Sequence, residues 1–226
     1  MTTFLALDTS AAASAAIVTE DTVFARWSTE DTTSHAEVLA PAVRDVLREA
    51  DVNGADLDGI AVGVGPGPFT GLRSGLATAE ALGFAWNVPV HGVTSLDALA
   101  HQVAEDAFAH GIEEFVTTID ARRREVYWGH YVQVGGQITP LHGPFVTPPG
   151  EVTPLPAYGA GAGLYPDQLR AVDGFEQLTP QAEAIGALAL LALRRGRGLQ
   201  PLTPLYLRES DAKVPGPRKS ATPATR

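Results

Sequence analysis

The chain has 226 residues and a mass of 23.7 kDa, which suits one domain or two small lobes. Hydrophobic residues make up 45% and charged residues only 19%, so we expect a packed core and exclude a wholly disordered chain. The net charge of −10 disfavours nucleic-acid binding by this chain alone, and the absence of cysteine excludes disulfides, thiolate zinc sites and a cysteine nucleophile.

The start of the chain, Met1–Asp8, lacks the basic region of a signal peptide. No apolar run in the sequence is long enough to span a bilayer. We therefore expect a soluble, cytoplasmic protein without membrane contact.

The first hundred residues predict an α/β lobe. Apolar runs predict three antiparallel strands over residues 4–7, 13–18 and 22–28. A capping-box pattern at Ser34 and Glu37 predicts a helix that Pro41 kinks or delays. Further strands are predicted over 57–64 and 88–93, and further helices over 70–86 and 95–108. We assign this lobe to residues 1–100.

The second half has a similar order of elements, which suggests a duplicated lobe over residues 101–212. It predicts strands over 115–119, 125–134 and 137–146, a proline-rich irregular stretch over 144–156, a glycine–alanine loop over 157–163 and a helix over 183–193. The tail from Lys213 to Arg226 is basic and rich in proline, serine and threonine, so we expect it to be disordered.

Three small polar residues, Asp8, Thr9 and Ser10, end the first predicted strand. A carboxylate followed by hydroxyl residues in a turn is one way to meet nucleotide phosphates and magnesium. The alternative is a strand-end aspartate that satisfies its own turn, and short motifs of this kind give many false positives.

A glycine-rich segment runs from Gly63 to Gly75, and Thr70 is placed to cap the helix that follows. It is not a Walker A loop, because no Lys-Ser/Thr follows the glycines, and it matches the dinucleotide pattern poorly. Gly71, Gly75, Ala79 and Gly83 share one helical face, which predicts close packing of another backbone. That backbone belongs either to the chain's own sheet or to another subunit's helix.

Three consecutive arginines, Arg122–Arg124, lie between Asp120 and Glu125. They either bind phosphate or a partner's carboxylates, or form a solvated hairpin paired with these two acids. Hydrolase chemistry has little support, since the six histidines form no His-Glu-x-x-His and no Gly-x-Ser-x-Gly elbow occurs.

Together these segments resemble the TsaB (YeaZ) family, bacterial proteins that assist in making threonylcarbamoyladenosine in the anticodon loop of tRNA. The matching pieces, in order, are LALDTS at 5–10, the helix start with His35, Glu37, Leu39 and Pro41, GPGPFTGLR at 65–73, GVTSL at 92–96, DARR at 120–123, EVY at 125–127 and PLYLR at 204–208. One departure is Pro68, where the family usually has serine, and this removes a hydroxyl from the loop.

The resemblance implies the two-lobed actin/Hsp70-like (ASKHA, ribonuclease H-like) fold. In the related catalytic subunit TsaD, the segment that corresponds to residues 92–99 carries two metal-binding histidines. Ser95 and Leu99 stand at those positions here and cannot replace two imidazoles. We therefore expect no catalytic residue, no metal and no cofactor in this chain, with Asp8, Thr9 and Ser10 as remnants of a phosphate loop.

The resemblance also implies a heterodimer with TsaD through the first two helices, a larger complex with TsaE, contact with tRNA only through that complex, and possible homodimerisation through the same surface. The residues expected to form or support this interface are His35, Leu39, Val43, Gly71, Leu72, Gly75, Leu76, Ala79 and Gly83. Two alternatives stay open: an ATP-using kinase-like enzyme with Asp8 and the Gly159–Gly163 loop in its cleft, and a metallopeptidase.

Overall fold

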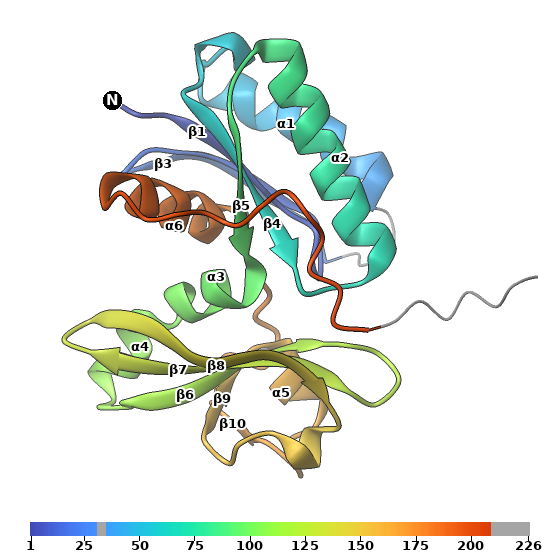
Figure 1. The fold of residues 1–226 in the computed structure, drawn as a ribbon, viewed down its shortest axis with the longest axis vertical. Coiled ribbons are helices and arrows are strands. Elements are labelled where there is room, and N and C mark those ends of the chain that lie inside the picture. The colour runs from blue at the N-terminus through green and yellow to red at the C-terminus, as the bar shows by residue number, and fades with distance from the viewer. Residues whose placement is uncertain (31–34, 209–226) are drawn as a thin grey trace, which may run out of the picture.

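The computed structural model describes residues 1–30 and 35–208 and has two lobes, each built around a five-stranded mixed sheet (Figure 1). The strands are β1 (Phe4–Asp8), β2 (Ser14–Val18), β3 (Val23–Ser28), β4 (Gly59–Gly65), β5 (Val90–Thr94), β6 (Glu114–Asp120), β7 (Val126–Val134), β8 (Gln137–Thr147), β9 (Pro156–Tyr158) and β10 (Arg170–Ala171). The α-helices are α1 (His35–Glu49), α2 (Phe69–Trp86), α3 (Ser95–Gln102), α4 (Ala104–Ala109), α5 (Ala160–Leu164) and α6 (Ala182–Arg194). None of the helices in this part of the chain is long and apolar enough to cross a membrane.

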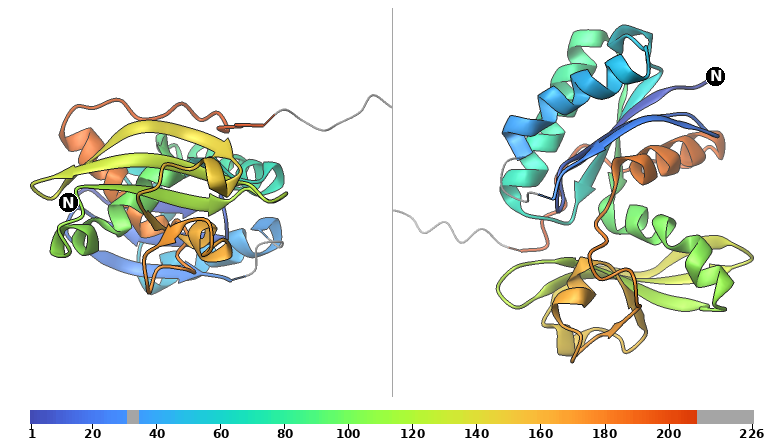
Figure 2. Two further views of the ribbon diagram at one scale, coloured as in Figure 1. Left: turned by 90° about the horizontal axis from the view of Figure 1, so that it is seen from below. Right: turned by 180° about the vertical axis from the view of Figure 1, so that it is seen from behind.

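The first sheet has the order β3-β2-β1-β4-β5. β1 pairs antiparallel with β2 and parallel with β4, so the expected three-strand meander continues into a parallel half. Every residue of β1 and β4 is buried, because helices cover both faces of the sheet. Figure 2 shows α1 and α2 side by side on one face and α6 on the other.

Each face of the first sheet has its own core. Leu39 and Val43 of α1 and Leu76 of α2 pack with Leu5 and Ile60 on one side. Helix α1 continues through Pro41. Proline has no N–H to donate to the carbonyl one turn earlier, but Pro41 is exposed, so water can hydrogen-bond to that carbonyl.

The second sheet repeats the topology of the first. Its order read from β8 is β8-β7-β6-β9-β10, with β6 antiparallel to β7 and parallel to β9. These relations match those of β1 with β2 and β4, so the two lobes have the same strand order, as the similar order of elements in the two halves suggested.

The lobes exchange helices. Helix α3 follows β5 but packs on the second sheet, where Leu96 and Leu99 join the core around Phe115. Helix α6 follows the second sheet and packs back on the first, with Ile185 and Leu190 against Phe4. The proposed division between residues 100 and 101 thus falls inside α3. The core of each lobe includes a helix that comes next to the other lobe in the sequence.

The structure corrects three predicted elements. The helix expected over 95–108 breaks at Val103, which turns both Val103 and Ala107 into the second core. The stretch from residue 144 to 147 continues β8 instead of being irregular, because an edge strand tolerates Pro144. The loop over 157–163 holds part of β9 and α5. The predicted cap at Ser34 and the tail after Ala212 lie outside the described residues.

Candidate functional site

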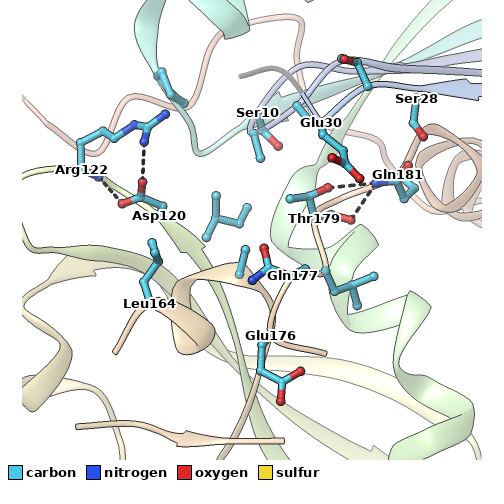
Figure 3. Close-up of a pocket in the computed structure, with 17 residues that line it drawn as sticks. Ser10, Ser28, Glu30, Asp120, Arg122, Leu164, Glu176, Gln177, Thr179 and Gln181 are labelled. Atoms are coloured by element: carbon cyan, nitrogen blue, oxygen red, sulfur yellow. Dashed lines mark hydrogen bonds and ion pairs between the residues drawn. The ribbon is translucent and has the colours of Figure 1, made fainter. Parts of the chain in front are cut away.

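A cavity of about 650 Å³ lies between the lobes, at the ends of β1 and β6 (Figure 3). Its polar lining includes Ser10 and Glu30 from the first lobe and Asp120 and Arg122 from the second. The linker between β10 and α6 adds Glu176, Gln177, Leu178, Thr179 and Gln181. This is where a fold of two such lobes would hold a small ligand, so the sequence-predicted polar residues must be tested against it.

Asp8 does not reach this cavity. Its side chain is fully buried, and its Oδ1 accepts hydrogen bonds from the Ser10 backbone N–H at 2.8 Å and the Ser10 hydroxyl at 2.6 Å. Its Oδ2 accepts one from the Ser95 hydroxyl at 2.7 Å, and Ser95 accepts one from the Gly65 N–H at 3.2 Å. Asp8 therefore joins β1, β4 and α3 inside the protein, which agrees with the alternative that it satisfies its own turn.

The glycine-rich segment closes over the turn after β1. A Cβ added to Gly67 would lie 2.5 Å from the Ser10 carbonyl oxygen, so the two backbones touch. The Thr9 hydroxyl donates a hydrogen bond of 2.8 Å to the Gly71 carbonyl and ties β1 to the start of α2. The loop therefore occupies the space next to the turn, where a phosphate would have to approach.

The corresponding strand end of the second lobe is Asp120. Its Oδ1 accepts a 2.7 Å hydrogen bond from the Arg122 N–H, and its Oδ2 pairs with the Arg122 guanidinium at 3.0 Å (Figure 3). Burial, and then the Asp120 charge, raise the pKa of the Tyr127 phenol above its usual value. The charge of the Asp120 carboxylate is therefore balanced by Arg122, two positions further along the chain.

The arginine turn is held in an unusual conformation. Arg122, Arg123 and Arg124 have φ values of 59°, 55° and 63°, in the left-handed region that costs an L-residue roughly 1–2 kcal/mol. Arg208 supports the turn by donating to the Ala121 carbonyl at 2.9 Å and by pairing with Glu125. The predicted pairing of Asp120 within the hairpin is confirmed, but Glu125 pairs with an arginine from the far end of the chain.

The glycine–alanine stretch also packs on its own chain. An added Cβ at Gly159 would lie 2.4 Å from the Thr118 carbonyl oxygen, and one at Gly163 would lie 2.1 Å from the Glu176 carbonyl oxygen. The Thr118 hydroxyl donates to the Tyr158 carbonyl at 3.0 Å and accepts from the Ala162 N–H at 2.8 Å. These glycines therefore allow β6, α5 and the linker to approach one another.

Ser95 and Leu99, which stand where TsaD has its two metal-binding histidines, are both buried and make contacts inside the protein. Ser95 bonds Asp8, while Leu99 packs in the second core. Over residues 1–30 and 35–208, no group of three or more histidine, aspartate or glutamate side chains is placed to hold a metal ion.

The small-residue stripe of α2 faces the chain's own sheet. Added Cβ atoms at Gly75 and Gly83 would lie 2.3 Å from Thr9 Oγ1 and from Val90 Cγ2. The remaining expected interface residues are likewise buried inside the first lobe: Leu39, Val43, Gly71, Leu72, Leu76 and Ala79. Burial against the sheet leaves these residues no exposed side chain for direct contact, and their expected support of a partner interface stays a prediction. The side chain of His35 lies outside the described part.

The outer faces of α1 and α2 carry residues that sequence reasoning missed. Phe84 is 91% exposed, the most exposed aromatic side chain among the described residues. Ala77 and Ala81 lie on the same side of α2, and Ala40 and Pro41 are exposed on α1. The signal was present in the spacing, since 77, 81 and 84 lie on the side of the helix opposite the glycine stripe.

Comparison with known proteins gives a consistent result. The family model described as tRNA N6-adenosine threonylcarbamoyltransferase (TsaD) matches residues 29–182. An uncharacterized protein of Mycobacterium tuberculosis is 39% identical over 94% of this chain and 95% of its own length. The tRNA threonylcarbamoyladenosine biosynthesis protein TsaB of Escherichia coli is 30% identical over 94% of this chain and 98% of its own.

A solved structure of YeaZ from Pseudomonas aeruginosa superposes with a TM-score of 0.78 at 36% identity, covering 92% of this chain and all of that one. The similarity extends over both lobes. The predicted two-lobed α/β fold is therefore confirmed.

Proposed function

Since the chain belongs to the TsaB (YeaZ) family, we propose that it is the non-catalytic partner subunit that binds and activates TsaD, in a complex with TsaE that transfers threonylcarbamoyl to adenosine in the anticodon loop of tRNA. Such a role implies a cytoplasmic location. It also implies that tRNA meets this chain only within the assembled complex.

The use of Asp8 inside the protein is the observation that carries the non-catalytic assignment. Hydrogen bonds from the Ser10 N–H, the Ser10 hydroxyl and the Ser95 hydroxyl bind its two oxygens, and the side chain has no exposed surface. A catalytic or metal-binding carboxylate must present an oxygen to its ligand. Asp120 does line the cavity, but its carboxylate is paired with the Arg122 guanidinium at 3.0 Å.

The outer face of α1 and α2 supports the partner assignment. Phe84, whose ring is 91% exposed, lies on the same side of α2 as the exposed Ala77 and Ala81, and contiguous exposed apolar patches mark contact sites. Small neighbours at Ala77 and Ala81 would let a partner's helix approach α2 closely, with Phe84 as the anchor. In the absence of TsaD the same face would serve self-association.

The test is co-elution of the purified chain with TsaD in gel filtration. Phe84→Glu places a charge on this face and should abolish co-elution without loss of helical circular dichroism. Phe108→Glu, at a ring that is 63% exposed on α4, is the matched control and should co-elute as the wild type does. Equal co-elution of both variants would refute the interface.

An ATP-using enzyme is the second candidate, because the cavity of about 650 Å³ is large enough for a nucleotide. Its lining disfavours phosphate, since Glu30 and Glu176 add carboxylates to the Asp120–Arg122 pair. Calorimetry of the isolated chain with Mg-ATP separates the two candidates. Micromolar binding would favour the enzyme, whereas we expect no measurable heat.

A further inference from the structure

The segment after α6, residues 199–208, forms a strap that returns across the first lobe (Figure 1). The Gln200 N–H donates to the Gly92 carbonyl at 3.0 Å, and the Leu205 N–H donates to the Val64 carbonyl at 2.8 Å. The end of the strap reaches the second lobe through Arg208, which bonds the Ala121 carbonyl. The strap therefore brings Tyr206 and Arg208 to the side of the molecule where α2 begins and the arginine turn lies.

Tyr206 packs against two residues of α2. Its ring centroid lies 4.4 Å from that of Phe69, and its hydroxyl accepts a 2.8 Å hydrogen bond from Arg73 Nε. The Arg73 guanidinium lies 5.7 Å from both ring centroids. Arg73 is exposed and 36% of Tyr206 is exposed, so a cation and an aromatic ring are presented together to solvent.

The strap joins this cluster to the arginine turn, because Tyr206 and Arg208 are two residues apart and Arg208 bonds the Ala121 carbonyl; we call the combined set the arginine patch. It consists of Phe69, Arg73, Tyr206, Arg208 and the turn Arg122–Arg124, with Asp120 and Glu125 as its acids. Within this set, five arginines stand against two carboxylates, an excess of three positive charges in a chain whose net charge is −10. Glu30 and Glu176 lie in the cavity next to Asp120 and Arg122, so the positive excess is clearest at Arg73, Arg123 and Arg124. A positive patch in an acidic chain indicates a surface for an anionic partner.

We propose that the arginine patch contacts the RNA of the tRNA substrate, by arginine–phosphate contacts and by stacking of an unpaired base near Tyr206. The inference rests on the proposed function, which brings tRNA to the complex. Exposed aromatic rings interleaved with arginines suit single-stranded RNA loops, whose splayed bases stack on aromatic and guanidinium planes. An acidic protein segment would use the arginines but gain little from the exposed ring.

The patch lies at the start of α2, while Phe84 lies near its end, about 22 Å away along the helix axis. Arg73 lies one helical turn before Ala77 on the same side of α2, so the patch borders the face proposed for the partner. A partner on that face and an RNA on the patch would therefore be neighbours in one complex.

The experiment measures binding of an unmodified tRNA transcript to the complex of this chain with TsaD, by fluorescence anisotropy across a salt series. Arg73→Glu combined with Arg124→Glu should weaken the Kd at least tenfold. It should also make the slope of log K against log salt shallower by about 1.5, because two phosphate contacts are lost. Arg195→Glu combined with Arg197→Glu, the same charge change at exposed residues beyond α6, is the control and should leave both values unchanged.

Wild-type Kd and slope in the patch variant would overturn the proposal. A second outcome would also overturn it: the variant binds TsaD or TsaE more weakly, but the complex that does assemble keeps the wild-type affinity for tRNA. The patch would then be a protein contact. Failure of the proposed function looks different: the wild-type complex would form no modified adenosine, whatever its affinity for tRNA.

Discussion

Replacement of Gly75 by alanine sets two effects of α2 against each other. Alanine inside a helix is favoured over glycine by roughly 1 kcal/mol. In this fold, however, the new Cβ would lie 2.3 Å from Thr9 Oγ1, which donates to the Gly71 carbonyl at 2.8 Å. Overpacking costs about 1–3 kcal/mol and a lost hydrogen bond about 0.5–1.5 kcal/mol. We expect a net loss of about 1–3 kcal/mol in the free energy of unfolding.

Removing the obstacle should reverse the sign. In a Thr9→Ala background the nearest remaining atom is Cβ at 3.4 Å, an ordinary contact, so Gly75→Ala should then stabilise by up to about 1 kcal/mol. Urea unfolding of the wild type, both single variants and the double variant gives the cycle. Destabilisation by Gly75→Ala in both backgrounds would refute the claim that the stripe packs on Thr9.

Three further changes probe buried polar groups. Asp8→Ala should lower the free energy of unfolding by about 3 kcal/mol or more. It leaves buried donors of Ser10 and Ser95 without an acceptor, at a cost of about 1–3 kcal/mol each. A smaller loss, measured by urea unfolding, would contradict the network. Burial raises the pKa of Asp97, so folding disfavours its charged form, and the stability of the wild type relative to Asp97→Asn should fall as pH rises through that raised pKa. A pH-independent difference would count against this. Gln133→Met should raise the free energy of unfolding by about 1 kcal/mol, since Gln133 Nε2 is buried without a hydrogen-bond partner among the described residues. A lower melting temperature of the variant would show that the amide is satisfied.

The order of elements was predictable because it is written in local patterns. Apolar runs of strand length and helical spacing located the strands of the first lobe and helices α1, α2 and α6 to within a few residues. The short elements β9, α5 and β10 were missed, since Pro156–Tyr158 and Ala160–Leu164 are held by backbone contacts with Thr118 and Glu176.

The direction in which the glycine stripe faces could not be read from its spacing. Packing on a sheet and packing on another helix need the same small residues, and the decisive contact joins Gly71 to Thr9, 62 positions away. The partner of Asp8 is hidden for the same reason, since Ser95 lies 87 positions further along the chain. Helix exchange between the lobes likewise depends on long-range packing that no local pattern encodes.

The arginine turn illustrates how motifs that are separate in sequence combine. DARR and EVY are neighbours at 120–127, whereas PLYLR at 204–208 follows only after most of the second lobe, yet Arg208 bonds the Ala121 carbonyl and pairs with Glu125. A single sequence shows each motif but not that they meet, because the strap crosses back over the first lobe before it reaches them.

The most direct test of the central claim is reconstitution of tRNA threonylcarbamoylation with TsaD, TsaE, the threonylcarbamoyl-adenylate donor and unmodified tRNA, with this chain present or omitted. The account predicts that modified adenosine forms only when the chain is present, and that Phe84→Glu behaves like omission while Phe108→Glu supports wild-type yield. Equal product with and without the chain would contradict it.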